Sequence, residues 1–345
     1  ILVTHVGAKS PAVGVFQVGD IILGVDGKLF TDDARKSLGK AITEAERTEN
    51  KGILKLVRFR AGKKENVQLQ LRVMGTYSAT APFDCPKSRK ILIEACRWLE
   101  KESLDDGMWG AVNGLALLAT GNIEYRPTVQ KQARSMASKK LEFDGADRCD
   151  TWGWGYKNVF LCEYYLATGD KEVLPAIRDL TIALARGQGM YGTFGHGGAD
   201  RTADGKLHGS IPPYGPVNQS GLMGNLAIVM GRKCGVKDPE VDAAVDRAAR
   251  FFKYFSGKGA IPYGEHMPWP YHENNGKNAL AALLFSVQGK HVPEAQFFAK
   301  TCTAAYMNRE YGHTGQGFSY LWGAFGANVG GPAAASAFFR EARWH

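Results

Sequence analysis

The first part of the chain alternates apolar and polar positions in the way that short strands do. Residues 1–6 form a β-branched apolar run, and residues 19–27 (GDIILGVDG) predict a strand that ends in an Asp-Gly hairpin turn. Residues 32–47 have the spacing of an amphipathic helix. Residues 53–59 and 66–73 predict two more strands joined at an Ala-Gly turn. This order of elements predicts a small α+β domain.

After a polar, proline-marked linker at residues 76–87, apolar residues recur at helical spacing to the end of the chain. Helices are expected over residues 88–102, 111–119, 127–139, 156–167, 171–187, 219–233, 239–256, 275–287, 292–308, 316–327 and 332–342. They come in pairs, and each connector has a glycine that can close one helix in a left-handed cap. These connector glycines are Gly121, Gly169, Gly235 and Gly289. The pattern predicts a repeat of helical hairpins.

A second motif recurs at the opposite ends of these hairpins, where an aromatic residue stands beside glycine. The four turns are Gly107-Met108-Trp109-Gly110, Gly192-Thr193-Phe194-Gly195, Ala260-Ile261-Pro262-Tyr263-Gly264 and Tyr311-Gly312. Three of them continue into histidine. Similar turns at one end of every hairpin favour a closed ring over an open solenoid, because a ring gathers the turns at one rim.

The N-terminal motifs resemble a known domain. The order V-x-x-x-S-P-A, then G-D-I-I-L-G-V-D-G, then a helix and two strands is similar to a PDZ domain of the bacterial, protease-associated kind. The resemblance covers residues 1–75 and implies that a peptide or protein segment adds as a strand between the first strand and the helix. Ile1 and Val3 on the strand and Leu38 and Ile42 on the helix would line that peptide groove. The serine-protease motif that often accompanies such domains is absent.

The helical part resembles the α/α-toroid architecture of terpenoid cyclases, prenyltransferase β-subunits and many α/α-barrel carbohydrate enzymes. The expected fold is therefore multidomain: a small α+β PDZ-like domain at residues 1–75, a linker at 76–87, and an all-α α/α-toroid, a barrel of helical-hairpin repeats, at 88–345. The whole arrangement also resembles an uncharacterised family of secreted bacterial PDZ-plus-toroid proteins. That resemblance implies a secreted or periplasmic location.

The amino-acid composition limits the kinds of partner that the protein is expected to have. The 345 residues carry a net charge of +9, but no Lys/Arg run is dense enough for a nucleic-acid stripe. We therefore expect no nucleic-acid partner. No apolar run reaches the length of a membrane span, so no membrane-spanning helix is expected either. The six cysteines form no C-x-x-C motif, and their even number leaves disulfides open. Because Ile1 begins inside an expected strand, we expect the chain to be a piece of a longer protein.

Three histidines are the sharpest candidates for chemistry. In a closed ring the turns would bring His196, His266 and His313 to one mouth, with Glu265 beside the second. Three imidazoles can hold a catalytic zinc with an open fourth position, or they can act as acids and bases. Alternatively, each histidine serves only its own turn. The cysteine-ligated zinc of prenyltransferases and the acidic motifs of terpene cyclases have no counterpart here.

Aromatic residues separated by glycine form a second candidate site. Trp152, Trp154 and Tyr156 stand beside Asp150 at the start of a helix, and Tyr263 and Tyr311 lie in the glycine-aromatic turns. Exposed rings of this kind stack on sugar faces, and Asp150 with Glu265 would supply carboxylates for glycoside chemistry. Alternatively, the rings fill the top of the barrel core. The long segment 188–218 is a further candidate for a lid or binding loop.

Two hypotheses follow. The first is a PDZ-docked enzyme, a glycoside hydrolase or a lyase-like α/α-barrel enzyme, that acts on a carbohydrate or related polymer. The second is a non-catalytic peptide- and glycan-binding or scaffold protein.

Overall fold

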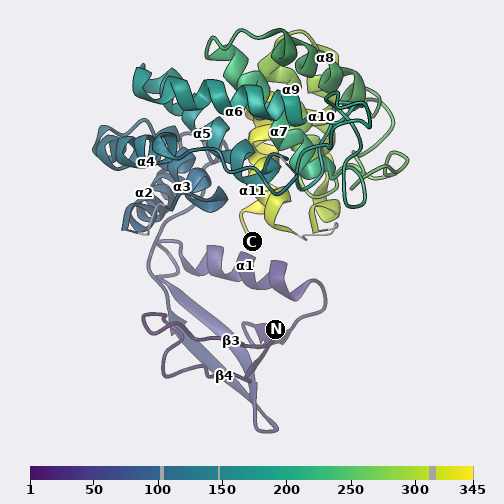
Figure 1. The fold of residues 1–345 in the computed structure, drawn as a ribbon. Coiled ribbons are helices and arrows are strands. Elements are labelled where there is room, and N and C mark those ends of the chain that lie inside the picture. Colours follow the sequence, from purple (N-terminus) through teal and green to yellow (C-terminus); the bar gives the residue numbers. More distant parts are fainter. Residues whose placement is uncertain (102–104, 147, 311–315, 345) are drawn as a thin grey trace. The chain divides into compact units, whose positions relative to one another are not determined.

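The structure is a computed structural model that describes residues 1–101, 105–146, 148–310 and 316–344. The chain forms two compact units. The first holds residues 1–93 together with the end of the chain from Phe339, and the second holds Glu94–Phe338. Figure 1 shows a small sheet with one helix in the first unit and helices throughout the second. The expected order of a small α+β part followed by an all-α part is confirmed.

The first unit contains a four-stranded antiparallel sheet of strand order β2-β1-β3-β4. Its strands are β1 (Ile21–Val25), β2 (Lys28–Leu29), β3 (Ile53–Arg60) and β4 (Lys63–Gln70). The turns Asp26-Gly27 and Ala61-Gly62 join neighbouring strands, and all four residues have positive φ angles between 47° and 80°. Two-residue hairpins require this backbone, which glycine adopts at no steric cost. Both turns were predicted at these residues and are confirmed.

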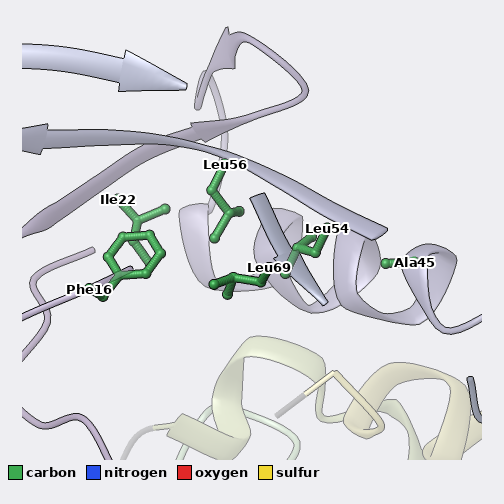
Figure 2. Close-up of a cluster of buried hydrophobic side chains, with 6 residues drawn as sticks. All are labelled: Phe16, Ile22, Ala45, Leu54, Leu56 and Leu69. Atoms are coloured by element: carbon green, nitrogen blue, oxygen red, sulfur yellow. The ribbon is translucent and has the colours of Figure 1, made fainter. Parts of the chain in front are cut away.

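Helix α1 (Ala34–Ala45) packs on this sheet. The Asp33 side chain caps its start by accepting a hydrogen bond from the Arg35 N–H at 3.0 Å. Alternate residues of β3 point inward, and Figure 2 shows them in the core of the unit. The core side chains are Phe16, Ile22, Ala45, Leu54, Leu56 and Leu69.

The prediction of a strand over residues 1–6 is wrong for the residues after Val3. Leu2 forms an isolated antiparallel bridge with Ile21, and the Val3 N–H donates to the Asp20 carbonyl at 2.8 Å. After that point the chain leaves the sheet and turns, and the Ser10 N–H bonds to the Gly7 carbonyl instead. The residues after Val3 therefore do not continue the strand.

The chain then continues through helices close to those predicted. They are α2 (Pro86–Lys101), α3 (Met108–Ala119), α4 (Arg126–Ser138), α5 (Thr151–Thr168), α6 (Leu174–Gly187), α7 (Asn218–Lys233), α8 (Pro239–Lys253), α9 (Lys277–Gln288), α10 (Val292–Ala304), α11 (Gln316–Val329) and α12 (Pro332–Ala342). Short 3-10 turns lie at Ile123–Tyr125, Lys171–Val173 and Tyr306–Glu310. Gly169 and Gly289 close α5 and α9 in the left-handed conformation, as the connectors predicted.

The helices of the second unit pack as an alternating series. α3, α5, α7, α9 and α11 contact one another in that order, while α4, α6, α8 and α10 pack against them. The helical-hairpin repeat is therefore confirmed. Each even-numbered helix in this group contacts the odd-numbered helix before it, so successive hairpins stack through their odd-numbered members.

Aromatic side chains also join two helices that are far apart in this series. The Trp152 ring of α5 stacks on the Phe318 ring of α11, with centroids 5.6 Å apart. One turn further along both helices, the Trp322 indole N–H donates to the Tyr156 hydroxyl at 3.2 Å. Residues i and i+4 share one face of a helix, so α5 and α11 face each other through two matched pairs of rings.

Candidate functional site

The start of helix α7 holds two of the glycine-aromatic turns in place. The buried Asn218 side chain donates from Nδ2 to the carbonyls of Pro262 and Gly264, both at 3.1 Å. Its Oδ1 accepts a hydrogen bond from the Thr193 hydroxyl at 3.2 Å. One side chain thus joins turns from two different hairpins.

The start of helix α5 holds the neighbouring segment that carries His196. The Asp150 carboxylate caps the helix by accepting from the Gly153 N–H at 3.0 Å. Asp150 also forms an antiparallel bridge with Gly197, and the Gly198 N–H donates to the Cys149 carbonyl at 2.9 Å. These backbone contacts place His196 beside the first turn of α5.

The side chains meet in what we call the aromatic cluster, which consists of Trp152, His196, Tyr214, Tyr263 and Phe318. The Trp152 indole N–H donates to His196 Nδ1 at 2.9 Å, and His196 Nε2 lies 2.6 Å from the Tyr214 hydroxyl. The Tyr214 hydroxyl is in turn 3.1 Å from the Tyr263 hydroxyl. A continuous chain of hydrogen bonds therefore runs from an indole through an imidazole to two phenols.

This chain fixes the tautomer of neutral His196. An indole N–H can only donate, so His196 Nδ1 must be the unprotonated acceptor and Nε2 must carry the hydrogen. Nε2 then donates to the Tyr214 oxygen. Burial, followed by the bond to Tyr214, raises the pKa of Tyr263 to about 12, so this residue remains a neutral phenol at physiological pH. Tyr263 therefore takes part in this chain as a neutral hydroxyl group.

The aromatic cluster is open to ligands. Tyr214 is 58% exposed and His196 is exposed, whereas Trp152, Tyr263 and Phe318 are half-buried. Half-buried rings are held firmly by their neighbours and still present surface, which suits stacking on a flat ligand. The exposed Tyr214 hydroxyl beside them can form a further hydrogen bond with that ligand.

The structure places Glu265 beside the cluster, whereas it shows no hydrogen bond from the described His266 side chain to the cluster. A Cβ atom at Gly215, the residue after Tyr214, would lie 3.7 Å from the Glu265 carboxyl carbon. Both Glu265 and His266 are exposed at the tip of the hairpin that carries Tyr263. Among the described residues, no hydrogen bond joins the His266 ring to the cluster, and its backbone N–H donates to Gly264.

Two of the rings expected on an exposed platform lie in the core. Helix α5 begins at Thr151, five residues earlier than predicted, so these residues project from several faces of one helix. Trp154 is 7% exposed and its ring meets Phe143 edge to face at 5.0 Å. Tyr156 is fully buried. Only Trp152 presents its ring at the surface.

Tyr311 and His313 lie outside the described residues, so the structure does not place them. Among the residues that it does describe, no three His, Cys, Asp or Glu side chains gather as metal ligands. Asp150, His196 and Glu265 lie at or near the aromatic cluster. Tyr214 and Phe318 complete the cluster, and the sequence also indicated them, because both lie in glycine-containing segments comparable to those of the other predicted rings.

The first unit has an apolar pocket of about 240 Å³ where the peptide groove was predicted. Val3, Leu38 and Ile42 line it, and Ile1 packs against the core cluster beside it. The remaining lining residues are Val6, Ser10, Pro11, Ala12, Phe16, Ile22, Leu54, Leu56, Leu69, Leu71 and His5. The pocket therefore opens between the N-terminal segment and α1.

These features define a two-part protein, with a small sheet domain and a helical-hairpin repeat that bears an aromatic surface site. Residues 88–345 match the family described as Domain of unknown function (DUF6288), and the chain belongs to that family. No curated protein and no solved structure matches the chain. None of the described helices is both long and apolar enough to cross a membrane.

Proposed function

We propose that the helical unit is an α/α-toroid that binds a carbohydrate or related polymer at the aromatic cluster, and that a PDZ-like first unit docks the protein on a peptide or protein segment. The observation that carries the proposal is the convergence of Trp152, His196, Tyr214 and Tyr263. These residues come from α5, a glycine turn, the long segment before α7 and the hairpin before α9.

The toroid proposal is supported by the packing of alternate helices. α3, α5, α7, α9 and α11 contact one another in series, and the ring pairs between α5 and α11 bring distant members of that series face to face. A closed ring accounts for this return, since an open solenoid would carry α11 away from α5.

The carbohydrate proposal is supported by the chemistry of the cluster. Sugar rings have apolar C–H faces and equatorial hydroxyl groups, so they need a ring to stack on and hydrogen-bonding groups at its edge. The half-buried Trp152 supplies the ring. The exposed Tyr214 hydroxyl supplies a polar group at its edge, because a phenol oxygen can take one more hydrogen bond beyond those to His196 and Tyr263.

A catalytic role is the second candidate, and one observation favours it. His196 has a defined tautomer and a hydrogen-bonded path to Tyr263, with the Glu265 carboxylate near Tyr214. An imidazole and a carboxylate at the edge of a sugar site can act as acid and base in glycoside cleavage or in lyase chemistry. We also propose a secreted or periplasmic bacterial setting, which rests on the resemblance alone.

The test of the helical unit is a titration with neutral and acidic oligosaccharides, followed by tryptophan fluorescence and calorimetry. We expect Trp152→Leu to abolish binding. Trp109→Leu is the matched control, because Trp109 is also exposed, at 56%, and lies on α3 outside the cluster. Equal losses in the two variants, or no binding by the unchanged protein, would reject the proposal. Release of shorter sugars, lost in His196→Ala, would establish the catalytic alternative.

The test of the first unit is a peptide-library titration of the full chain. We expect Leu38→Glu to weaken peptide binding by at least tenfold, because it places a charge in the apolar pocket. Leu29→Glu is the control, since Leu29 is 51% exposed on β2 and outside the pocket. Binding that survives Leu38→Glu would place the peptide elsewhere.

A further inference from the structure

A second concave site lies in the helical unit beside α6. It is a cavity of about 730 Å³, within the range of ligand pockets, and we call it the arginine cavity. Its apolar wall consists of Leu141, Phe143, Ile182 and Leu207, and its guanidinium groups are those of Arg178, Arg186 and Arg201.

Three carboxylates also line this cavity, and each already has a partner. Asp179 lies 3.7 Å from Arg178, and Asp200 lies 3.4 Å from Arg148. Asp238 caps helix α8 by accepting from a backbone N–H at 2.8 Å. Each of the three carboxylates therefore already has an ion-pair or hydrogen-bond partner within the protein.

Two of the arginines have no such partner. Within the described parts of the chain, no carboxylate lies within ion-pair distance of Arg186 or Arg201. Arg201 uses Nη1 to donate to the Gly205 carbonyl at 3.0 Å, which leaves the rest of its guanidinium group available. Both side chains are exposed. The cavity thus pairs an apolar wall with two fork-shaped donors that have no ion-pair partner among the described residues and whose geometry suits a carboxylate.

The arginine cavity adjoins the aromatic cluster through two paired segments. Cys149 lines the cavity, and Asp150 and Trp152 follow it toward the cluster. On the opposite segment Ala199 lines the cavity, three residues after His196. Consecutive Cα atoms are 3.8 Å apart, so the backbones of His196 and Ala199 are at most about 11 Å apart. The aromatic cluster and the arginine cavity therefore lie on neighbouring stretches of the same two backbone segments.

We propose that the arginine cavity is a subsite for a carboxylate-bearing sugar, a uronate, in the same polymer that the aromatic cluster binds. The apolar wall packs against the face of the sugar ring, and Arg186 and Arg201 pair with its carboxylate. This inference rests on the proposed function and names its substrate class as an acidic polysaccharide.

The experiment compares a neutral glucose tetrasaccharide with a galacturonate tetrasaccharide on the full chain by calorimetry. We expect the acidic sugar to bind about tenfold more tightly, with an affinity that falls as salt rises. The double variant Arg186→Gln, Arg201→Gln should remove this preference and leave the neutral sugar unaffected. Arg250→Gln is the matched control, because Arg250 is an exposed arginine of the same unit outside the cavity.

Equal affinities for the two sugars would overturn this inference and leave the proposed function standing. A preference for the acidic sugar that survives the double variant, or that Arg250→Gln removes equally, would also overturn it. Absence of binding by either sugar would reject the proposed function itself, and the subsite with it.

Discussion

Replacing Asn218 by alanine tests whether helix α7 holds the site-bearing turns. The side chain makes three hydrogen bonds, two to the carbonyls of Pro262 and Gly264 and one from the Thr193 hydroxyl. Asn218 is fully buried, so water cannot replace the lost amide without the structure opening.

The magnitude follows from these contacts. A buried hydrogen bond contributes about 1 kcal/mol net, so three lost bonds cost about 3 kcal/mol. The two carbonyls left behind belong to buried residues, which adds to the loss and gives an expected total of about 3–5 kcal/mol. With a urea slope of about 3 kcal/mol/M for a protein of this size, the unfolding midpoint should fall by about 1–1.7 M.

The assay is urea unfolding followed by circular dichroism, with hydrogen exchange over residues 190–198 and 260–269 as the local readout. Exchange there should accelerate in Asn218→Ala before the helices open. Gln130→Ala is the control, because Gln130 is an exposed residue of α4 and its loss should cost no more than about 0.5 kcal/mol. A midpoint shift in Asn218→Ala no larger than in this control would refute the reasoning.

Three further predictions concern other parts of the chain. Paired hydrogen bonds from Arg60 lower the pKa of Asp20 from 3.8 to about 2, so the stability that this carboxylate adds is complete above pH 3.8 and is lost as the pH falls through about 2. Hydrogen exchange in β3 should therefore accelerate over that interval, and Asp20→Asn should remove the dependence. A Cβ at Gly231 would lie 1.9 Å from Thr181 Oγ1, so Gly231→Ala should lower stability by about 1–3 kcal/mol in thermal unfolding; an unchanged midpoint would show that α6 and α7 yield at this contact. Cys234 is half-buried and its hydrogen bond to Cys162 lowers its pKa, whereas burial raises the pKa of the other thiols in its unit, so among these thiols iodoacetamide should label Cys234 first. Peptide mapping that finds a buried thiol of the same unit labelled equally fast would contradict this. Those slower thiols are Cys96, Cys149, Cys162 and Cys302.

Local features of the fold were predictable because their causes are local. The hairpin turns at Asp26-Gly27 and Ala61-Gly62 need backbone angles that few residues other than glycine tolerate. The caps at Gly169 and Gly289 follow from the same steric argument. Helix periodicity likewise depends on neighbours three and four positions away, which the sequence displays directly.

The site was only partly predictable because it depends on contacts between distant segments. The bond between Tyr156 and Trp322 joins residues 166 positions apart, and no local pattern encodes that distance. The error in the predicted start of α5 affected the predicted site more, because it placed Trp154 and Tyr156 among the exposed rings. Glycines at positions 153 and 155 indicated a loop, but the Asp150 cap and the packing of Trp154 extend the helix through them.

The contacts that hold the site-bearing turns determine which residues of the site can be substituted without disturbing the fold. Asn218 binds main-chain carbonyls, and the Cys149–Asp150 segment pairs with the main chain of Gly197 and Gly198. Every residue type offers such carbonyls, and every type except proline offers such amides. The identities of the exposed side chains at the turn tips are therefore independent of the means that secure the turns. Residues such as Tyr214, Glu265 and His266 can therefore be exchanged for other residue types while the helices beneath them keep their packing.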